Sequence, residues 1–209
     1  MYGLSAKELR ALRTLDTPIK VQGFLDTLPM NWEKHGETHY SPRGVLRHKK
    51  AHCIEGAVLA AAAFWLHGRP PLLMDLSSID GVGEEDHVIA LYKRGERWGA
   101  VGKTNHATIR FRDPVYKNLR ELAMSFFHEW FMNSNGLKTL ESYSLPLDLR
   151  RHGDAWMTAE DVWWLDDALN ARPHVRLLPL GGRAYLRCAD PMELKAGRLV
   201  EWPKSDPRT

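Results

Sequence analysis

Residues 53–67 of the chain read CIEGAVLAAAAFWLH and are apolar around nearly the whole circumference of a helix. Gly68, followed by Pro70 and Pro71, supplies a signal that ends such a helix. A helix that is apolar on every side has to be covered on every side. The sequence therefore predicts a central, buried helix that begins at Cys53.

Upstream of this segment the sequence predicts a layer of shorter helices. Ser5 can cap a helix that runs through Leu15. Thr17-Pro18 and Ser41-Pro42 each combine a capping side chain with a proline at the first helical position. Residues 29–40, between the last two helices, are polar and are expected to be irregular.

Downstream, short runs rich in β-branched and aromatic residues predict strands at 72–76, 87–92, 98–101 and 108–111. Arg94-Gly95 lies between the second and third runs and predicts an antiparallel hairpin. Asp113-Pro114 predicts the cap of a long helix that ends near Met132.

The C-terminal part carries weaker signals. Thr158 and Asp161 predict the start of a helix that extends through Leu169. Gly181-Gly182 predicts a turn between strands at 175–180 and 184–187. The chain is therefore expected to have an α+β fold in which N-terminal helices pack on an antiparallel sheet. We expect residues 1–150 to form the core, and residues 151–209 a small α/β C-terminal extension that could also belong to the same domain.

The composition excludes several classes of protein. The chain has 209 residues, 44% of them hydrophobic, which is enough to build a core and excludes overall disorder. A net charge of +3 is too small for a dedicated nucleic-acid binder. The longest apolar run, residues 57–66, is shorter than the roughly 18 to 20 residues that span a bilayer. No membrane association is expected and, without a secretory signal at the N-terminus, a cytoplasmic location is the default.

Cys53, His87 and Asn105 form a candidate catalytic set. Cys53 begins the buried helix, where the first-turn amides and the helix dipole favour a thiolate. His87 begins a predicted strand that can pack on the helix and bring a base to the thiol. Asn105 follows the hairpin and could accept a hydrogen bond from the second ring nitrogen. Each residue also has a plain structural interpretation: a buried thiol, a surface imidazole and a turn amide.

Two strings carry a resemblance to a known family: AHCIEGAVLAAAAFWLHGRPPLLMDL at 51–76 and DHVIALYKRGERWGAVGKT at 86–104. Together with the helix expected after Ser41, they resemble the transglutaminase-like branch of the papain-type cysteine enzymes. The resemblance covers about a third of the chain. It implies a papain-like core in which Cys53 is the nucleophile and His87 the base.

The third catalytic residue departs from the family pattern. The family places an aspartate at the end of a Trp-x-x-Val-Asp string, whereas Trp98 and Val101 are here followed by Gly102. Asn105 would correspond to the amide of papain-type enzymes, and Asp113 and His106 are alternatives. For the oxyanion, the amide of Cys53 is the first candidate donor. A second donor could come from Gln22, Asn31 or Trp32.

Metal and nucleotide sites find less support in the sequence. His48 and His52 have the i, i+4 spacing of a helical metal pair, but no HExxH motif is present. His35 and Glu37 match half of a zinc-deaminase motif, whose cysteine pair is missing. The glycines of residues 81–86, GVGEED, lack the Lys-Ser/Thr of a phosphate loop. The basic run at residues 47–50 is either a solvated face or a local field that lowers the thiol pKa. No metal and no cofactor are expected.

The resulting expectation is a cysteine-dependent amide hydrolase or acyl transferase that works through a thioester on Cys53. Its substrate would be a peptide, a protein or a small amide, with hydrolysis favoured because water needs no second binding site. The main alternative is a non-catalytic scaffold or binding protein with a degenerate triad. A hydrolase that uses a metal bound by His48 and His52 is a third possibility. The sequence leaves the oligomeric state open.

Overall fold

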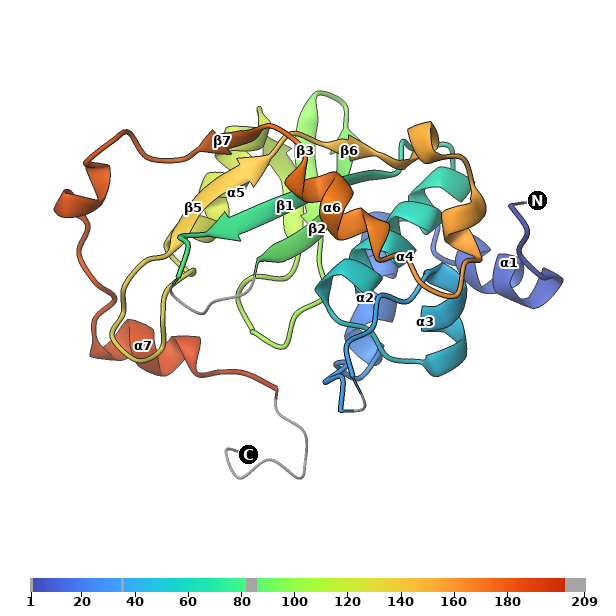
Figure 1. Cartoon of the computed structure of the whole chain (residues 1–209), viewed down its shortest axis with the longest axis horizontal. Coiled ribbons are helices and arrows are strands. Elements are labelled where there is room, and N and C mark those ends of the chain that lie inside the picture. The colour runs from blue at the N-terminus through green and yellow to red at the C-terminus, as the bar shows by residue number, and fades with distance from the viewer. Residues whose placement is uncertain (1, 35, 82–85, 202–209) are drawn as a thin grey trace.

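The computed structural model describes residues 2–34, 36–81 and 86–201. Within these ranges the chain forms seven α-helices and a seven-stranded antiparallel sheet. The strand order is β4-β3-β2-β1-β5-β7, and β6 pairs with β1 beside β5. Figure 1 shows α1 to α4 gathered on one side of the sheet. The α+β class with an antiparallel sheet is confirmed.

The helices are α1 (Ala6–Arg13), α2 (Pro18–Thr27), α3 (Pro42–His48), α4 (Cys53–Leu66), α5 (Leu119–Phe127), α6 (Trp164–Asn170) and α7 (Pro191–Gly197). The strands are β1 (Leu72–Ser78), β2 (His87–Arg94), β3 (Arg97–Val101), β4 (Arg112–Tyr116), β5 (Leu140–Ser144), β6 (Leu147–Asp148) and β7 (His174–Arg176). Three short 3₁₀ turns are η1 (Leu149–His152), η2 (Ala155–Met157) and η3 (Gly182–Tyr185).

The predicted N-terminal caps are present. The Ser5 hydroxyl accepts from the amide of Glu8 at 3.3 Å, and the Glu8 carboxylate accepts from the amide of Ser5 at 2.6 Å. Thr17 and Ser41 cap α2 and α3 in the same way through their hydroxyls. Each cap satisfies an amide that has no partner inside its own helix, and so fixes where the helix begins.

Helix α4 is the centre of the core, as its composition predicts. Every residue from Ile54 to Phe64 is buried, and α1, α2, α3 and β2 pack around it. The sheet beneath has two apolar faces, because side chains alternate along a strand. Val88 and Ala90 pack in the cluster around α4, whereas Ile89 and Leu91 pack in the cluster around α5. The sheet therefore lies between α4 and α5.

The predicted hairpin between β2 and β3 is confirmed. Arg94 pairs with Arg97, leaving two residues in the turn. Gly95 has a φ of 59°, which glycine adopts without the steric cost of a Cβ.

The strand and helix that follow the hairpin differ from the prediction. The strand is β4, at 112–116 instead of 108–111, and it contains Asp113 and Pro114. A proline is tolerated there because β4 lies at the edge of the sheet. Helix α5 begins only at Leu119, where Asn118 accepts from the amide of Glu121 at 2.9 Å, and it ends at Phe127 instead of Met132.

The C-terminal elements also differ. Thr158 follows the turn η2, and α6 begins at Trp164 without a side-chain cap. The strand predicted at 175–180 is the three-residue β7, and the segment predicted at 184–187 is a 3₁₀ turn rather than a strand. Strands β5 and β6 and helix α7 were not predicted.

Residues beyond 150 contribute to both the sheet and the core. Strand β7 pairs with β5, and Trp156, Val162, Leu165 and Leu169 are buried in the cluster around α4. A division at residue 150 remains a prediction. No helix in the described ranges is both long and apolar enough to cross a bilayer.

Candidate active site

Cys53 is the first residue of α4, at the point where the chain turns into the helix. The preceding residue, His52, has an extended backbone and occupies the cap position. The Cys53 side chain is partly buried. Amides in the first helical turn lack intrahelical acceptors and, together with the helix dipole, stabilise a negative charge on the sulfur.

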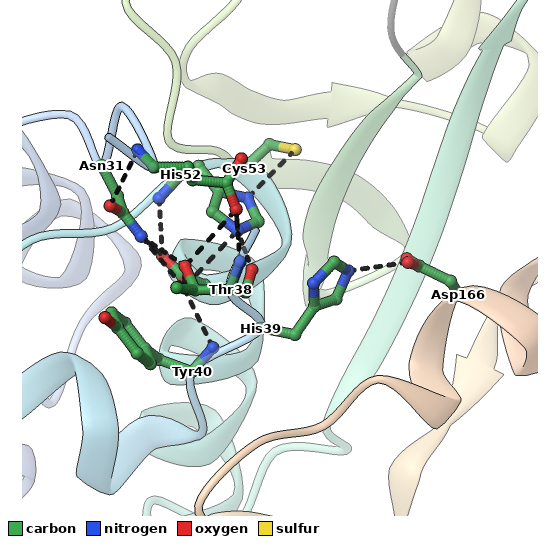
Figure 2. A network of polar contacts seen from close by, with 9 residues as sticks. Asn31, Thr38, His39, Tyr40, His52, Cys53 and Asp166 are labelled. Carbon is green, nitrogen blue, oxygen red and sulfur yellow. Dashed lines mark hydrogen bonds and ion pairs between the residues drawn. The ribbon is translucent and has the colours of Figure 1, made fainter. Parts of the chain in front are cut away.

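Glu55 holds the irregular segment before α3 against this end of α4. Its carboxylate is completely buried and accepts from the amides of His52 and Tyr40, both at 2.9 Å. It also accepts from the Thr38 hydroxyl at 2.8 Å and from the Asn31 side-chain amide at 3.0 Å. Figure 2 shows these donors converging on one point. The backbone around Cys53 is therefore fixed by a buried polar network.

His52 lies directly against the thiol. Its Nδ1 is 4.0 Å from the Cys53 sulfur, and the contact is drawn in Figure 2. Its Nε2 is 2.7 Å from the carbonyl oxygen of Thr38. The carboxylates of Glu55 and Glu33 lie 3.5 and 3.6 Å from the same nitrogen. The ring is thus held at both nitrogens.

His87 is the second imidazole at the thiol. It is the first residue of β2, its side chain is 5% exposed, and its ring centre is 6.2 Å from that of Trp130. Its Nε2 is buried and has no hydrogen-bond partner among the described residues. A Cβ placed on Gly102 would lie 3.0 Å from that nitrogen. Nε2 therefore faces Gly102, and the His87 side chain also interacts with the Cys53 thiol.

The two imidazoles change the acidity of the thiol. Burial raises the pKa of Cys53, but hydrogen bonds and charge from His52 and His87 outweigh it and lower the pKa to about 6. Burial lowers the pKa of His52, yet the Cys53 thiolate, Glu55 and the Thr38 carbonyl raise it to about 9. Both shifts favour a thiolate beside an imidazolium at neutral pH. Such a pair is a nucleophile with a proton donor next to it.

The backbone of Gly102 is hydrogen-bonded to the Gln22 side chain. The amide of Gly102 donates to the Gln22 side-chain oxygen at 3.2 Å, and the Gly102 carbonyl accepts from the Gln22 nitrogen at 3.0 Å. Within the described residues none of the three sequence candidates, Asn105, Asp113 and His106, is hydrogen-bonded to Nε2 of His87. Asn105 as the orienting residue stays a prediction that this geometry does not support.

The three candidates differ in their surroundings. The carbonyl of Asn105 accepts from the amide of Glu201 at 2.9 Å. Asp113 lies in β4, where its charge, after burial, helps to raise the pKa of Tyr92. His106 is close enough to His87 to interact with it electrostatically: burial lowers the pKa of His106, and the charges of His87 and Arg110 lower it further.

Two of the candidate oxyanion donors are already engaged in the fold. The Asn31 amide donates to Glu55 and Thr38, and the Gln22 amide donates to Gly102 and Asp26. Trp32 is half-buried in the segment between α2 and α3. The backbone amide of Cys53 remains the donor best placed by the fold.

The chain was compared with models of known protein families and with curated proteins, and neither comparison gives a match.

The rings of His48 and His52, the alternative metal pair, point to different partners. The His48 ring stacks on Tyr40 with ring centres 4.5 Å apart, while His52 turns toward the thiol and Thr38. No cluster of three metal-ligating side chains occurs among the described residues. His35 lies outside them, as do four residues of the GVGEED string. In the basic run, Lys50 lies over the Tyr40 ring.

A histidine that the sequence did not single out completes the surroundings of the site. His39 Nε2 is 2.7 Å from the Asp166 carboxylate, and its ring packs at a tilt against Trp163, with ring centres 4.1 Å apart. The same ring meets His52 edge-on, with ring centres 5.5 Å apart. Figure 2 shows His39 between the Cys53 end of α4 and Asp166 on α6. No local motif could have found this pair, because its members come from distant parts of the chain.

Proposed function

We propose that the protein is a cysteine-dependent amide hydrolase or acyl transferase with a transglutaminase-like, papain-type core. The observation that carries this proposal is the Cys53 thiol, which begins a buried helix between two imidazoles and has a pKa lowered to about 6. A thiol used only for packing has no need of such an environment. Activated cysteines are found in such positions.

The arrangement of elements supports the same proposal. Helix α4 packs on β2, and β2 pairs with β1 on one side and β3 on the other, all antiparallel. The nucleophile lies at the start of the helix and an imidazole at the start of the central strand. This order agrees with the family that residues 41–113 resemble.

The chemistry follows from the thiolate. The sulfur attacks the carbonyl carbon of an amide, a carbon–sulfur bond forms, and the carbonyl electron pair moves to the oxygen, near the amide of Cys53. An imidazolium then gives its proton to the leaving nitrogen as the carbon–nitrogen bond breaks. Water, or a second amine, attacks the resulting thioester and releases the thiolate. With water the protein is a hydrolase, which we favour because no second binding site is required.

A non-catalytic scaffold is the second candidate, and one observation favours it. Gly102 stands where the resembled family has a carboxylate, and Nε2 of His87 has no partner among the described residues. A thiol in such a protein would be retained for packing or binding. The two candidates therefore differ in the reactivity of Cys53.

Alkylation with iodoacetamide tests the proposal. Cys53 should react with a rate that rises around pH 6, because its thiolate forms there. The modified residue is identified by peptide mass spectrometry. Cys188→Ala removes the other, exposed cysteine and should leave the Cys53 profile unchanged, whereas Cys53→Ala should abolish it. Modification at Cys188 alone, or a Cys53 profile that rises only near the ordinary value of about 8.5, would favour the scaffold.

Turnover provides the second part of the test. A panel of fluorogenic amides and small peptides should be hydrolysed by the wild type and not by Cys53→Ala. Thioester formation is detected as a mass increase on Cys53 that hydroxylamine removes. A reactive Cys53 that never acquires an acyl group from any of these substrates would argue for binding without catalysis.

A further inference from the structure

The hydrogen bonds of His52 determine which of its ring nitrogens carries a proton. A carbonyl oxygen only accepts, so the 2.7 Å contact with Thr38 requires a proton on Nε2. In the neutral ring the lone pair then lies on Nδ1. That nitrogen is the one 4.0 Å from the Cys53 sulfur. The ring is oriented to receive a proton from the thiol.

The surroundings of His52 also suit a positive charge. Glu55, from α4 itself, and Glu33, from the segment before α3, place carboxylate oxygens 3.5 and 3.6 Å from Nε2. The His39 ring also meets the His52 ring edge-on, and its own Nε2 is paired with Asp166 of α6. The Thr38 carbonyl accepts from Nε2 in both charge states. Protonation therefore leaves no new unpaired donor.

His87 lacks these features. Protonating its ring would place an N–H on both nitrogens, and Nε2 is buried against Gly102 with no acceptor among the described residues. A buried donor without an acceptor loses the hydrogen bond that it made with water. No carboxylate fills the position beside Nε2, because residue 102 has no side chain.

We propose that His52, the residue immediately before the nucleophile, is the catalytic base that takes the proton of the Cys53 thiol. This inference rests on the proposed function. The proton moves from the sulfur to Nδ1 of His52, and the freed sulfur electron pair forms the bond to the substrate carbon. Nδ1 then returns the proton to the leaving nitrogen as the carbon–nitrogen bond breaks. Thr38 and the two carboxylates act as positioning groups on Nε2.

Alkylation kinetics distinguish the effect of His52 on the Cys53 thiol from that of His87. The rate of Cys53 modification by iodoacetamide is followed from pH 5 to pH 10 in the wild type, His52→Gln and His87→Gln. His52→Gln should move the midpoint toward about 8.5, the ordinary value for a thiol. The rate at pH 6.5 should fall at least tenfold, because few thiolates remain. His87→Gln should lower the rate at pH 6.5 by a smaller factor.

His48→Gln is the matched control. His48 is also an imidazole near this end of the fold, but its ring stacks on Tyr40 instead of contacting Cys53. Its removal should leave the alkylation profile at the wild-type midpoint. If His87→Gln reduces the rate at pH 6.5 as much as His52→Gln or more, the proposal is overturned.

A measurement on the wild type covers the case in which His52→Gln does not fold, which circular dichroism would reveal. Nitrogen-15 resonances of the histidine rings report how many protons each ring carries. At pH 7.5 the His52 ring should be doubly protonated, and it should lose that charge in Cys53→Ser. A doubly protonated His87 and a neutral His52 would refute the assignment.

The outcomes also distinguish this inference from the proposed function. An unreactive Cys53 in the wild type contradicts the proposed function. A reactive Cys53 that hydrolyses amides and is indifferent to His52 contradicts only the assignment of the base.

Discussion

Asp75 is a buried carboxyl group in the middle of strand β1, and its burial disfavours the charged form. The residue is 3% exposed and accepts from the Ser77 hydroxyl at 2.5 Å, while His174 Nε2 lies 3.5 Å away. Burial raises the pKa of Asp75 to about 6; the charge of Asp86 adds to the shift, and Ser77 and His174 oppose it. The folded protein therefore carries a carboxylate that would be better solvated after unfolding.

Replacing Asp75 by Asn should stabilise the protein at pH 8. A carboxyl whose pKa rises on folding, here from about 3.9 to about 6, lowers stability as the pH rises through that interval, and the loss persists above it. Two pKa units set an upper limit of about 3 kcal/mol on the gain. The gain should largely vanish at pH 4, where Asp75 is protonated in the fold. Urea unfolding of the wild type and the variant at pH 8 and pH 4 measures the gain in stability and its loss.

Asp148→Asn is the control, because its effect on stability should have the opposite sign. A hydrogen bond with Arg150 lowers the pKa of Asp148, so its charge stabilises the fold above the ordinary carboxyl pKa and the effect is lost as the pH falls. This variant should be less stable than the wild type at pH 8. A loss of stability in Asp75→Asn at pH 8 would contradict the role assigned to burial.

Among single residues, the sequence predicts that Cys53 and His87 lie together, but it does not predict the other side chains around them. A thiol at the head of an apolar helix and a histidine at the head of a strand are visible in local patterns. The sequence presents His52 only as half of a metal pair, because its place beside the thiol depends on the extended backbone at this residue. The spacing of His52 and Glu55 resembles a capping box and could have identified the network at this end of α4. The sequence places Gly102 after Val101, but it does not show that the Gln22 side chain bonds to the Gly102 backbone.

Helix α4 approaches the sheet so closely that one of its residues has no room for a side chain. A Cβ on Gly56 would lie 2.4 Å from the Cβ of Lys103. Lys103 is itself buried, and its ammonium group donates to the Leu28 carbonyl at 2.6 Å. Burial lowers the pKa of this lysine. Gly56 thus allows α4, the chain after β3 and the end of α2 to meet.

Gly56→Ala should destabilise the protein although alanine favours helices. Overpacking in a core costs about 1 to 3 kcal/mol, which exceeds the roughly 1 kcal/mol gained in helix propensity. The matched control is Gly23→Ala in α2, where an added Cβ meets no atom within 4 Å. That variant should be stabilised by up to about 1 kcal/mol. Urea denaturation of both variants provides the measurement, and a stable Gly56→Ala would mean that α4 can move away from the sheet.

Helices and strands are predicted correctly where the signal is local, and incorrectly where pairing within the sheet determines the structure. Ser5, Thr17 and Ser41 mark helix starts because capping depends on the next few residues alone. Asp113-Pro114 carries the same signal but lies in a strand, since an edge position beside β3 offers pairing that does not need the missing proline amide. Strand β5 has no strong alternation in its sequence and forms because β1 and β7 lie on either side of it.

At the scale of the whole molecule, the late part of the chain is tied to the segment that precedes the site. The Ser41 hydroxyl donates to the Ala159 carbonyl at 2.6 Å, and the amide of Val162 donates to the His39 carbonyl at 2.8 Å. Arg43 joins Glu8 at 2.9 Å and also reaches the Thr158 carbonyl at 3.5 Å. These contacts link α1, α3 and the chain before α6.

A fragment of residues 1–150 should therefore fail to unfold cooperatively. The fragment lacks four residues of the core around α4: Trp156, Val162, Leu165 and Leu169. Each buried apolar side chain contributes roughly 1.5 to 3 kcal/mol to stability. Their sum is of the same order as the roughly 5 to 15 kcal/mol by which a domain is stable. Thermal unfolding followed by circular dichroism tests this. A sharp transition in the fragment would instead support a domain boundary near residue 150.

The contacts between residues 39–43 and residues 158–162 have a consequence for the growing chain. Cys53, His52 and Glu55 are made early, but Asp166 and the backbone that pairs with His39 are made more than a hundred residues later. Domains fold largely as units once their sequence has left the ribosome. During synthesis the segment before α3 therefore lacks the partners of His39 until residues 162–166 have been made.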